Sequence, residues 1–213
     1  MKKSSILFEL ILIISVIAII YLSFTPKKDS NNLKELENRI ILYLKELRYQ
    51  ALIDDKFKER EKINDDSIWH KRRWTMKFFR CRESVGGVYF VIYSEKNDTG
   101  QINQKESLKD PLTKKYIFAN NYCEQKSENS SYTLLSKNYN IKSVDMTCNS
   151  TTSLGQISFG NDGRVYSKLS NIYADENNYE IKKPCKIKFI TNDNKFFEIE
   201  ISPKTGFSQI ISK

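Results

Sequence analysis

Side chains capable of acid–base or nucleophilic chemistry are scarce in this chain of 213 residues. His70 is the single histidine, so any Ser-His-Asp or Cys-His arrangement would have to use it. The pairs Asp54-Asp55 and Asp65-Asp66 are adjacent in sequence, which points their side chains in different directions and favours surface charge over a metal site. The sequence therefore predicts a protein that is not an enzyme and has no metal or cofactor.

The four cysteines are the next candidates for chemistry. They are widely spaced, and the list is Cys81, Cys123, Cys148 and Cys185. An even number in an exported domain favours two disulfides, for which three connectivities exist. The spacing lacks the C-x-x-C pairs of a zinc site. From the expected strand positions we predict Cys81–Cys185 and Cys123–Cys148.

One carboxylate, Glu9, lies inside the apolar stretch Ile6–Phe24, which follows the basic start Met1-Lys2-Lys3. This stretch is long enough, at roughly 28 Å as a helix, to cross the roughly 30 Å hydrocarbon layer of a membrane. A carboxylate there costs a few kcal/mol unless it reaches the headgroups or finds a partner. A cleaved signal peptide and a simple anchor are the alternatives, and neither accounts for Glu9.

The segment Lys2–Ile11 (KKSSILFELI) resembles the class III leader of type IV pilins and type II secretion pseudopilins. In that family a prepilin peptidase cuts before the apolar run, a glutamate is the fifth residue after the cut, and a proline follows seventeen residues later. Glu9 and Pro26 have this spacing (26 − 9 = 17). The resemblance implies a cut between Ser4 and Ser5 and methylation of the new N-terminus, although the family usually has Gly before the cut and Phe after it.

The same resemblance implies a role for Glu9 in assembly. In a filament core the N-terminal ammonium of one subunit can meet the Glu9 carboxylate of a neighbour, so that each desolvated charge has a partner. The implied partners are other pilins or pseudopilins, the prepilin peptidase and the inner membrane. The rest of the chain is then expected in the periplasm or on the filament surface.

After Pro26 the pattern predicts an amphipathic helix to about Phe57. Its apolar positions follow helical spacing, and they are Leu36, Ile40, Tyr43, Leu44, Leu47 and Ala51. This stripe suits packing on a sheet, with a coiled-coil seam as the alternative. The predicted organisation is a leader at 1–4, a transmembrane or filament-core helix at 5–26, its amphipathic continuation at 27–57 and a β-rich domain at 58–213 with an insertion at about 95–150.

Strands are predicted where β-branched and aromatic residues alternate between turn signals. The candidates are Trp74–Cys81, Val88–Ser94, Tyr132–Ser136, Ile141–Met146, Gln156–Gly160, Val165–Leu169, Lys186–Thr191 and Phe196–Ser202. The two middle cysteines flank Tyr132–Ser136 and Ile141–Met146, which predicts a stapled subsidiary hairpin. The fold class is therefore α+β, with a long N-terminal helix packed on an antiparallel sheet in a pilin-like arrangement.

The C-terminal region resembles the GspH/FimT group of minor pseudopilins. The matching segments are Ile157–Arg164, Lys186–Phe189 and Ile199–Gly206. Some members of that group bind DNA through a Gly-Arg-x-Arg motif, whereas here Phe207 follows Gly206, so that site does not transfer.

A second basis for nucleic-acid binding lies elsewhere in the chain. The net charge is +9, or +7 without Lys2 and Lys3 (9 − 2), and basic and aromatic residues alternate from Trp69 to Trp74. Lys71, Arg72 and Arg73 would neutralise phosphates while Trp69 stacks on a base. The alternative is that Trp74 points into the core and the basic residues line a solvated loop.

The sequence also predicts one modification site and leaves two rival functions open. Asn97 begins an Asn-x-Thr glycosylation signal, with Glu95 at the acidic position that bacterial systems prefer. The leading prediction is a minor pilin or pseudopilin of a type IV pilus or type II secretion-type filament. The rivals are a DNA-binding minor pilin of a transformation pilus and an unrelated single-pass, membrane-anchored periplasmic binding protein.

Overall fold

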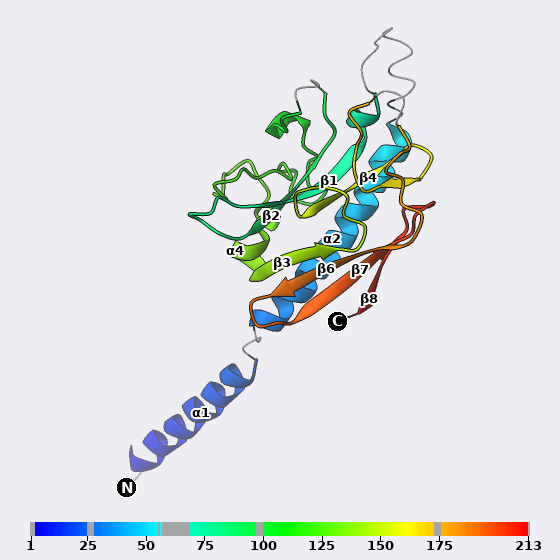
Figure 1. Ribbon diagram of the computed structural model, residues 1–213. Coiled ribbons are helices and arrows are strands. Elements are labelled where there is room, and N and C mark those ends of the chain that lie inside the picture. Colours follow the sequence, from blue (N-terminus) through cyan, green and yellow to red (C-terminus); the bar gives the residue numbers. More distant parts are fainter. Residues whose placement is uncertain are drawn as a thin grey trace. The chain divides into compact units, whose positions relative to one another are not determined.

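The computed structural model describes residues 3–24, 28–54, 56, 69–96, 100–172 and 176–212. Two compact units divide the chain, Met1–Glu35 and Leu36–Lys213. Helix α1 (Lys3–Phe24) lies in the first unit. Helix α2 (Lys28–Ile53) begins in the first unit and continues into the second, which also contains all the strands (Figure 1).

Helix α2 is held in the second unit by one apolar face. The residues predicted for its stripe are all buried: Leu36, Ile40, Tyr43, Leu44, Leu47 and Ala51. Their spacing places them on one side of a helix with 3.6 residues per turn. The opposite side carries exposed residues such as Tyr49 and Leu52. The amphipathic pattern thus identifies which face of α2 packs on the domain, and the described helix ends at Ile53.

Two antiparallel sheets of four strands each make up the rest of the second unit. The first has the order β2-β1-β4-β5, formed by Val88–Tyr93, Trp74–Arg80, Gly155–Phe159 and Val165–Tyr166. The second has the order β3-β6-β7-β8, formed by Ile141–Met146, Cys185–Thr191, Phe196–Ile201 and Ser208–Ser212. Short helices η1 (Trp69–Arg72), η2 (Gln104–Glu106), η3 (Ser131–Thr133) and α4 (Leu135–Tyr139) lie in the connections.

An aromatic cluster joins α2 to both sheets. The ring of Tyr43 on α2 lies 5.9 Å from that of Phe90 on β2, and Phe90 lies 6.0 Å from Phe78 on β1. Phe78 in turn meets Phe189 of β6 edge-on at 5.7 Å, and Phe189 stacks on Phe197 of β7 at 4.6 Å. Such pairs contribute about 0.5–1.5 kcal/mol each beyond the area they bury. The two sheets therefore share one core, and α2 is part of it.

Ser136 connects the neighbouring ends of the two sheets. Its hydroxyl accepts a hydrogen bond from the backbone N–H of Val88, at the start of β2, and donates one to the carbonyl of Ile141, at the start of β3. Gly87 makes this approach possible, because a Cβ there would lie 2.8 Å from the Ser136 Cβ. Its φ of +101° is also a conformation that side chains disfavour.

Asp110 forms a buried polar junction between α2 and the segment that follows β2. Its carboxylate accepts hydrogen bonds from the hydroxyls of Tyr43 (2.7 Å) and Ser130 (3.1 Å) and from the backbone N–H groups of Leu112 and Thr113. Burial by itself would raise the pKa of Asp110, but these hydrogen bonds outweigh it and hold the pKa below its ordinary value. The polar segment after β2 is thereby fastened to α2.

The predicted α+β class, the amphipathic helix and most of the strands are confirmed. The strand at Tyr132–Ser136 is wrong, because this segment forms η3 and the start of α4, with Ser136 turned towards the sheet junction. The subsidiary hairpin is wrong as well, since β3 pairs with β6. The stretch predicted as an insertion at 95–150 therefore contributes a strand to the second sheet and the buried Asp110 to the core.

Replacing Tyr43 by Phe tests the Asp110 junction. Tyr43→Phe removes a hydrogen bond to a buried carboxylate, so we expect the free energy of unfolding to fall by about 2 kcal/mol in urea denaturation. Tyr89→Phe is the matched control, because Tyr89 is also largely buried but its hydroxyl forms no hydrogen bond with a described residue. An equal loss in both variants would contradict this role for Tyr43.

Acid unfolding gives a second readout of the same junction. The folded-state pKa of Asp110 is lowered, so its contribution is present above the unfolded value of about 4 and is lost as the pH falls through the folded value. Tyr43→Phe weakens this pH dependence, because one of the bonds that lower the pKa is gone. An unchanged acid profile in Tyr43→Phe would count against the assignment.

Candidate functional site

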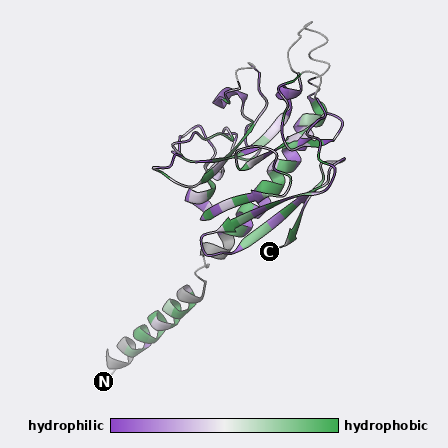
Figure 2. Cartoon of the chain, in the orientation of Figure 1, coloured by the Kyte–Doolittle hydropathy of each residue, from purple (hydrophilic) through white to green (hydrophobic). Residues whose placement is uncertain are grey.

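The described surface of α1 is apolar and uncovered. All of its described side chains, residues 8–21, are exposed, with Phe8 at 72% and Ile19 at 64%. Hydrophobic residues dominate this stretch in Figure 2. A helix that is apolar on all sides is normally buried in an assembly or a membrane. Across the described residues, however, no helix combines the length and the apolarity that crossing a membrane requires.

The two polar side chains of this surface differ in how they are satisfied. The Ser15 hydroxyl donates within its own helix, to the carbonyls of Ile11 and Leu12 at 2.9 Å each. Glu9 is exposed and forms no hydrogen bond or ion pair with any described residue. Ser15 therefore needs no external partner, whereas Glu9 has its whole hydrogen-bonding capacity available to another molecule.

The other residues of the predicted leader and assembly site are only partly described. Ser4 and Ser5 lie in the first turns of α1, where the structure describes the backbone and not the side chains. Pro26 lies outside the described residues, between α1 and α2. The predicted cut and the role of Pro26 stay predictions.

The predicted disulfide pairing is wrong. The bridges are Cys81–Cys123 and Cys148–Cys185, and the described residues contain no free cysteine. The predicted partners Cys81 and Cys185 lie next to β1 and at the start of β6, and these strands belong to different sheets. Cys185 begins β6, which pairs with β3, and Cys148 lies just beyond the end of β3.

The segment Trp69–Trp74 packs into the domain. Trp69 is 8% exposed, and its ring lies 4.9 Å from the guanidinium carbon of Arg73. The Arg73 guanidinium also covers the ring of Tyr166 at 3.7 Å and donates to the carbonyl of Glu176 at 2.7 Å. Trp74 donates its indole N–H to Asp54 at 2.9 Å. The alternative, with Trp74 in the core and the basic residues in a solvated loop, is met only in part, because Trp69 and Arg73 are buried and Trp74 is half-buried.

The predicted nucleic-acid site is consequently divided. Trp69 and Arg73 are buried, which removes the stacking ring and one of the three cations from the surface. Lys71 and Arg72 are partly exposed. Basic residues next to aromatic ones occur both in surface sites for nucleic acid and in internal cation–π stacks. The sequence pattern therefore did not distinguish the two. Binding of DNA elsewhere on the chain stays a prediction.

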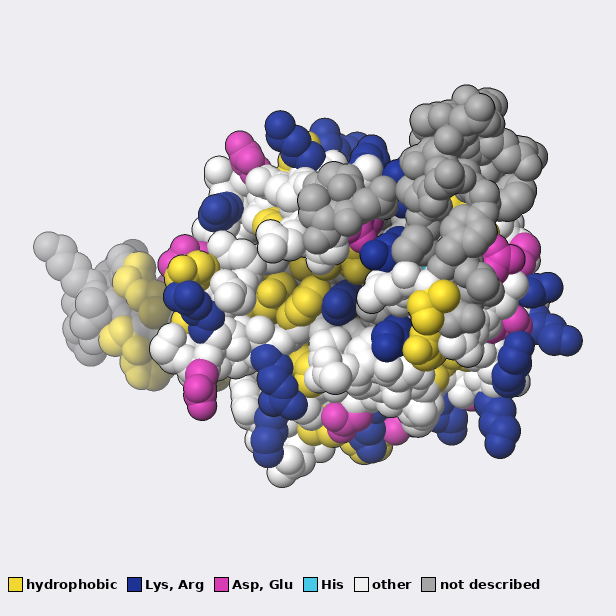
Figure 3. Space-filling model, turned by 45° about the horizontal axis from the view of Figure 1, so that its top comes forward, with side chains coloured by type: hydrophobic (Ala, Val, Ile, Leu, Met, Phe, Trp, Pro, Cys, Tyr) yellow, Lys and Arg dark blue, Asp and Glu magenta, His cyan; other side chains and the backbone are white. Residues whose placement is uncertain are grey.

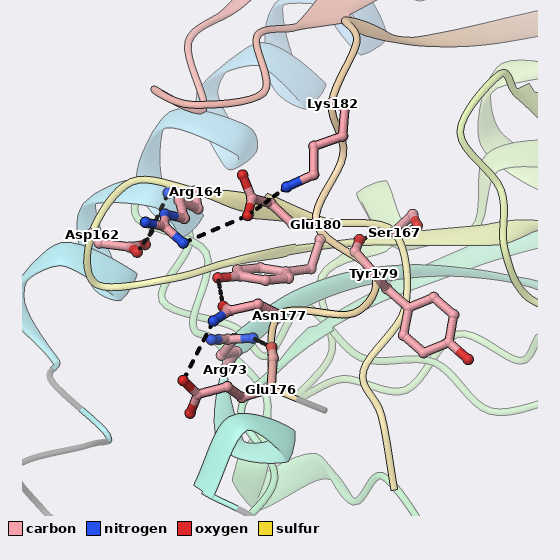
Figure 4. Close-up of polar contacts among 10 residues, drawn as sticks. Arg73, Asp162, Arg164, Ser167, Glu176, Asn177, Tyr179, Glu180 and Lys182 are labelled. Carbon is pink, nitrogen blue, oxygen red and sulfur yellow. Dashed lines mark hydrogen bonds and ion pairs between the residues drawn. The ribbon is translucent and has the colours of Figure 1, made fainter. Parts of the chain in front are cut away.

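The loop that carries Glu176 surrounds Arg73 with further polar contacts (Figure 4). Tyr166 donates a hydrogen bond from its hydroxyl to Asn177 at 2.8 Å. Glu180 pairs with Arg164 at 3.6 Å and with Lys182 at 3.0 Å. Arg73 is 5% exposed and contacts two rings and the Glu176 carbonyl, so its contacts position the loop.

His70 has a structural environment. It is fully buried, and its Nε2 lies 3.0 Å from the Ser170 carbonyl, so this nitrogen carries the proton and donates it. Burial lowers the pKa of His70 below its ordinary value, which keeps the ring neutral. Among the described residues, no group of three or more His, Cys, Asp or Glu side chains is placed to hold a metal ion.

The predicted glycosylation site, Asn97, lies outside the described residues. Of the two other Asn-x-Ser/Thr asparagines, Asn129 is buried and Asn149 is exposed. The Asn149 amide is occupied by hydrogen bonds to Thr151 and Ser153.

Sequence analysis passed over a group of polar residues on the first sheet. Lys77 lies in the middle of β1 and directly opposite Gln156 of β4, and Tyr93 ends β2. All three line one hollow, together with Lys71. The available signal was the position of Lys77, the one charged residue inside the otherwise apolar or small run Trp74–Phe79.

Comparisons with protein-family models, curated proteins and solved structures each found no match. The function is therefore argued from the residues and their geometry.

The disulfide pairing is directly testable. Peptide mapping without reduction is expected to link Cys81 to Cys123 and Cys148 to Cys185. Each bridge closes a long loop, with sequence separations of 42 and 37 residues, so removing Cys81 and Cys123 together should lower the free energy of unfolding by about 2–4 kcal/mol. A peptide joining Cys81 to Cys185 would contradict the structure.

The role of Arg73 is tested by Arg73→Lys. Lysine keeps the charge but loses the planar stack on Tyr166 and Trp69, so we expect a loss of about 1–3 kcal/mol in the free energy of unfolding. Arg82→Lys is the matched control, because Arg82 is exposed and lies 4.0 Å from the Tyr122 ring. A smaller loss in Arg73→Lys than in Arg82→Lys would refute the structural role of Arg73.

Proposed function

We propose that the chain is a minor pilin or pseudopilin, a low-copy structural subunit of a type IV pilus or type II secretion-type filament. The observation that carries the proposal is the combination found on α1. Its described surface is entirely exposed and apolar, and it presents one carboxylate, Glu9, without a partner among the described residues. Other copies of such a helix supply both the apolar cover and the missing charge.

Glu9 gives this assembly a specific contact. The N-terminal ammonium at Ser5 of a neighbouring subunit, freed by a prepilin peptidase, would pair with the Glu9 carboxylate. Inside a bundle of apolar helices an unpaired charge is strongly unfavourable, so the pair selects the arrangement in which both charges meet. Ser15 adds no competing preference because its hydroxyl is satisfied within the helix.

The location before assembly is proposed from the sequence. The apolar run Ile6–Phe24 suits the inner membrane, with the leader on the cytoplasmic side, although the side chains described in α1 cover only residues 8–21. The globular unit, with its two disulfides, fits an oxidising compartment outside the cytoplasm. One face of its helix α2 is buried in the domain.

The arrangement of α2 on antiparallel strands also supports the resemblance to the GspH/FimT group. Two of the matching segments, Lys186–Phe189 and Ile199–Gly206, lie in or begin in the strands of the hairpin β6–β7 of the second sheet. The DNA-binding alternative has less support, since Trp69 and Arg73 are buried.

The experiment is to follow Glu9→Gln into filaments in cells that assemble them. Glutamine keeps the shape of the side chain and removes its charge. We expect the variant to reach the membrane at the wild-type level and to enter sheared filaments at least about tenfold less, because the ammonium of its neighbour loses its partner.

Ser15→Ala is the matched control on the same helix, since its hydroxyl bonds only to α1 itself. We expect Ser15→Ala to enter filaments at the wild-type level. Equal incorporation of Glu9→Gln and the wild-type chain would overturn the proposal.

A further inference from the structure

A hollow of about 320 Å³ lies on the face of the first sheet that points away from α2. Met76 and Phe78 of β1 point into the core, so Lys77 between them points to the opposite face. Gln156, its partner on β4, and Tyr93 at the end of β2 line the same hollow. Figure 3 shows this face, where Lys and Arg side chains border a depression in which hydrophobic side chains are visible.

The hollow is positively charged. Three lysines line it, Lys71, Lys77 and Lys168, and none of them forms an ion pair with a described residue. Two of the ammonium groups lie near aromatic rings, that of Lys77 at 5.1 Å from the Phe79 ring and that of Lys168 at 4.9 Å from the Tyr179 ring. Among the described residues Glu95 is the one carboxylate in the lining; it interacts electrostatically with Lys77 and accepts a hydrogen bond from the backbone N–H of Gly100. The described side chains of the lining therefore sum to +2 (3 − 1).

Two nearly buried polar side chains in the lining have no partner. Gln156 is 5% exposed and Tyr93 is 7% exposed. Neither the Gln156 amide nor the Tyr93 hydroxyl forms a hydrogen bond within the described part of the chain. No polar atom of either side chain is itself buried without a partner, so the amide and the hydroxyl are open to the hollow, where water or a ligand can bond to them.

The protonation of Tyr93 fits a hydrogen-bond donor. Burial raises the pKa of its phenol above the ordinary value, and the nearby carboxylates of Glu95 and Glu106 raise it further. The hydroxyl therefore keeps its proton at neutral pH. Lys77 is also partly desolvated, which lowers its pKa and strengthens its attraction to an anion in the hollow.

The type of donor indicates the type of anion. Lysine ammonium groups act as point charges that suit tetrahedral phosphate, whereas arginine forks match planar carboxylates, and no arginine lines the hollow among the described residues. A charge of +2 matches a phosphate monoester, which carries nearly two negative charges at neutral pH. The volume is at the lower end for ligand pockets and leaves room for a small polar body beside the phosphate.

A sugar suits the space beside the phosphate, because hydroxyl and amide groups lie on the rim of the hollow. The turn at residues 150–153 contributes four side-chain hydroxyls to the lining, and Asn171 contributes an amide. We propose that this hollow binds a phosphorylated sugar, with Lys71, Lys77 and Lys168 around the phosphate and Gln156 and Tyr93 bonded to its oxygens. The site lies wholly in the second unit and is independent of the proposed filament role.

Titration calorimetry on the full chain, in a non-ionic detergent without a sugar headgroup, tests the site with glucose 6-phosphate. We expect saturable binding that is at least tenfold tighter than for inorganic phosphate or for glucose. Lys77→Met, which keeps the apolar stem, should weaken binding at least tenfold. Lys188→Met is the matched control on β6, because Lys188 pairs with Glu198 at 3.4 Å outside the hollow, and it should bind as the wild type does.

Gln156→Leu separates a ligand contact from a structural one. The amide forms no hydrogen bond with a described residue, so its removal should not lower the melting temperature, yet it should weaken glucose 6-phosphate binding several-fold. The absence of saturable binding at millimolar sugar phosphate, or unchanged affinity in both Lys77→Met and Gln156→Leu, would overturn the proposal. Tighter binding of a short single-stranded oligonucleotide, lost in Lys77→Met, would also overturn it and assign the hollow to nucleic acid.

Discussion

Burial of one face of α2 is the interaction on which the rest of the globular unit depends. The stripe from Leu36 to Ala51 lies against the aromatic cluster that joins both sheets, and Tyr43 belongs to the stripe and to the cluster. Each large apolar side chain buried in this way contributes about 1.5–3 kcal/mol. Without α2 the inner faces of two sheets would be exposed. The domain therefore completes its core with a helix whose chain leads back to α1.

Helices α1 and α2 use their apolar surfaces differently. That of α2 is buried when the domain folds, whereas that of α1 is available for assembly. The apolar face of α2 is covered by its own domain, whereas the side chains of residues 8–21 in α1 are all exposed in the part of the chain that the structure describes. In the proposed account, other subunits or lipid cover α1, and Glu9 selects among the arrangements that would do so. Hydrophobic contact alone is not directional, so a desolvated charge pair is what gives the helices a defined relation to one another.

Buried polar groups fasten the long connections that the core does not hold. Asp110 binds the segment after β2 to Tyr43, and Arg73 binds the segment after β5 through Tyr166 and the Glu176 carbonyl. Ser136 joins the neighbouring ends of β2 and β3. Lys77 and Gln156 differ from these, because both line a hollow and neither forms a hydrogen bond through its side chain with a described residue. This difference is what distinguishes the proposed ligand site from a structural network.

The local features of the fold were predictable from sequence, whereas its long-range contacts were not. The helical stripe of α2 and the hairpins β1–β2 and β6–β7 follow from periodicity and nearby turn residues. The cysteine pairing failed because it depends on which strands share a sheet, and periodicity carries no such information. Trp69 and Arg73 form an internal stack that has the same sequence pattern as a nucleic-acid surface. Asp110 precedes Pro111, which is an ordinary turn signal in the sequence. Its bond to Tyr43 was not predictable, because Tyr43 is 67 residues away.

The central claim is that α1 is an assembly helix whose leader is removed by a prepilin peptidase. The N-terminus of the mature chain tests this claim most directly. The measurement is N-terminal sequencing and intact mass of the chain co-expressed with such a peptidase, alongside Ser4→Gly, which restores the residue usual before the cut. The account predicts that the mature wild-type chain begins at Ser5, and that Ser4→Gly is cut at the same bond at least as completely. Retention of Met1–Ser4 in both chains, while a known prepilin in the same cells is cut, would contradict the account.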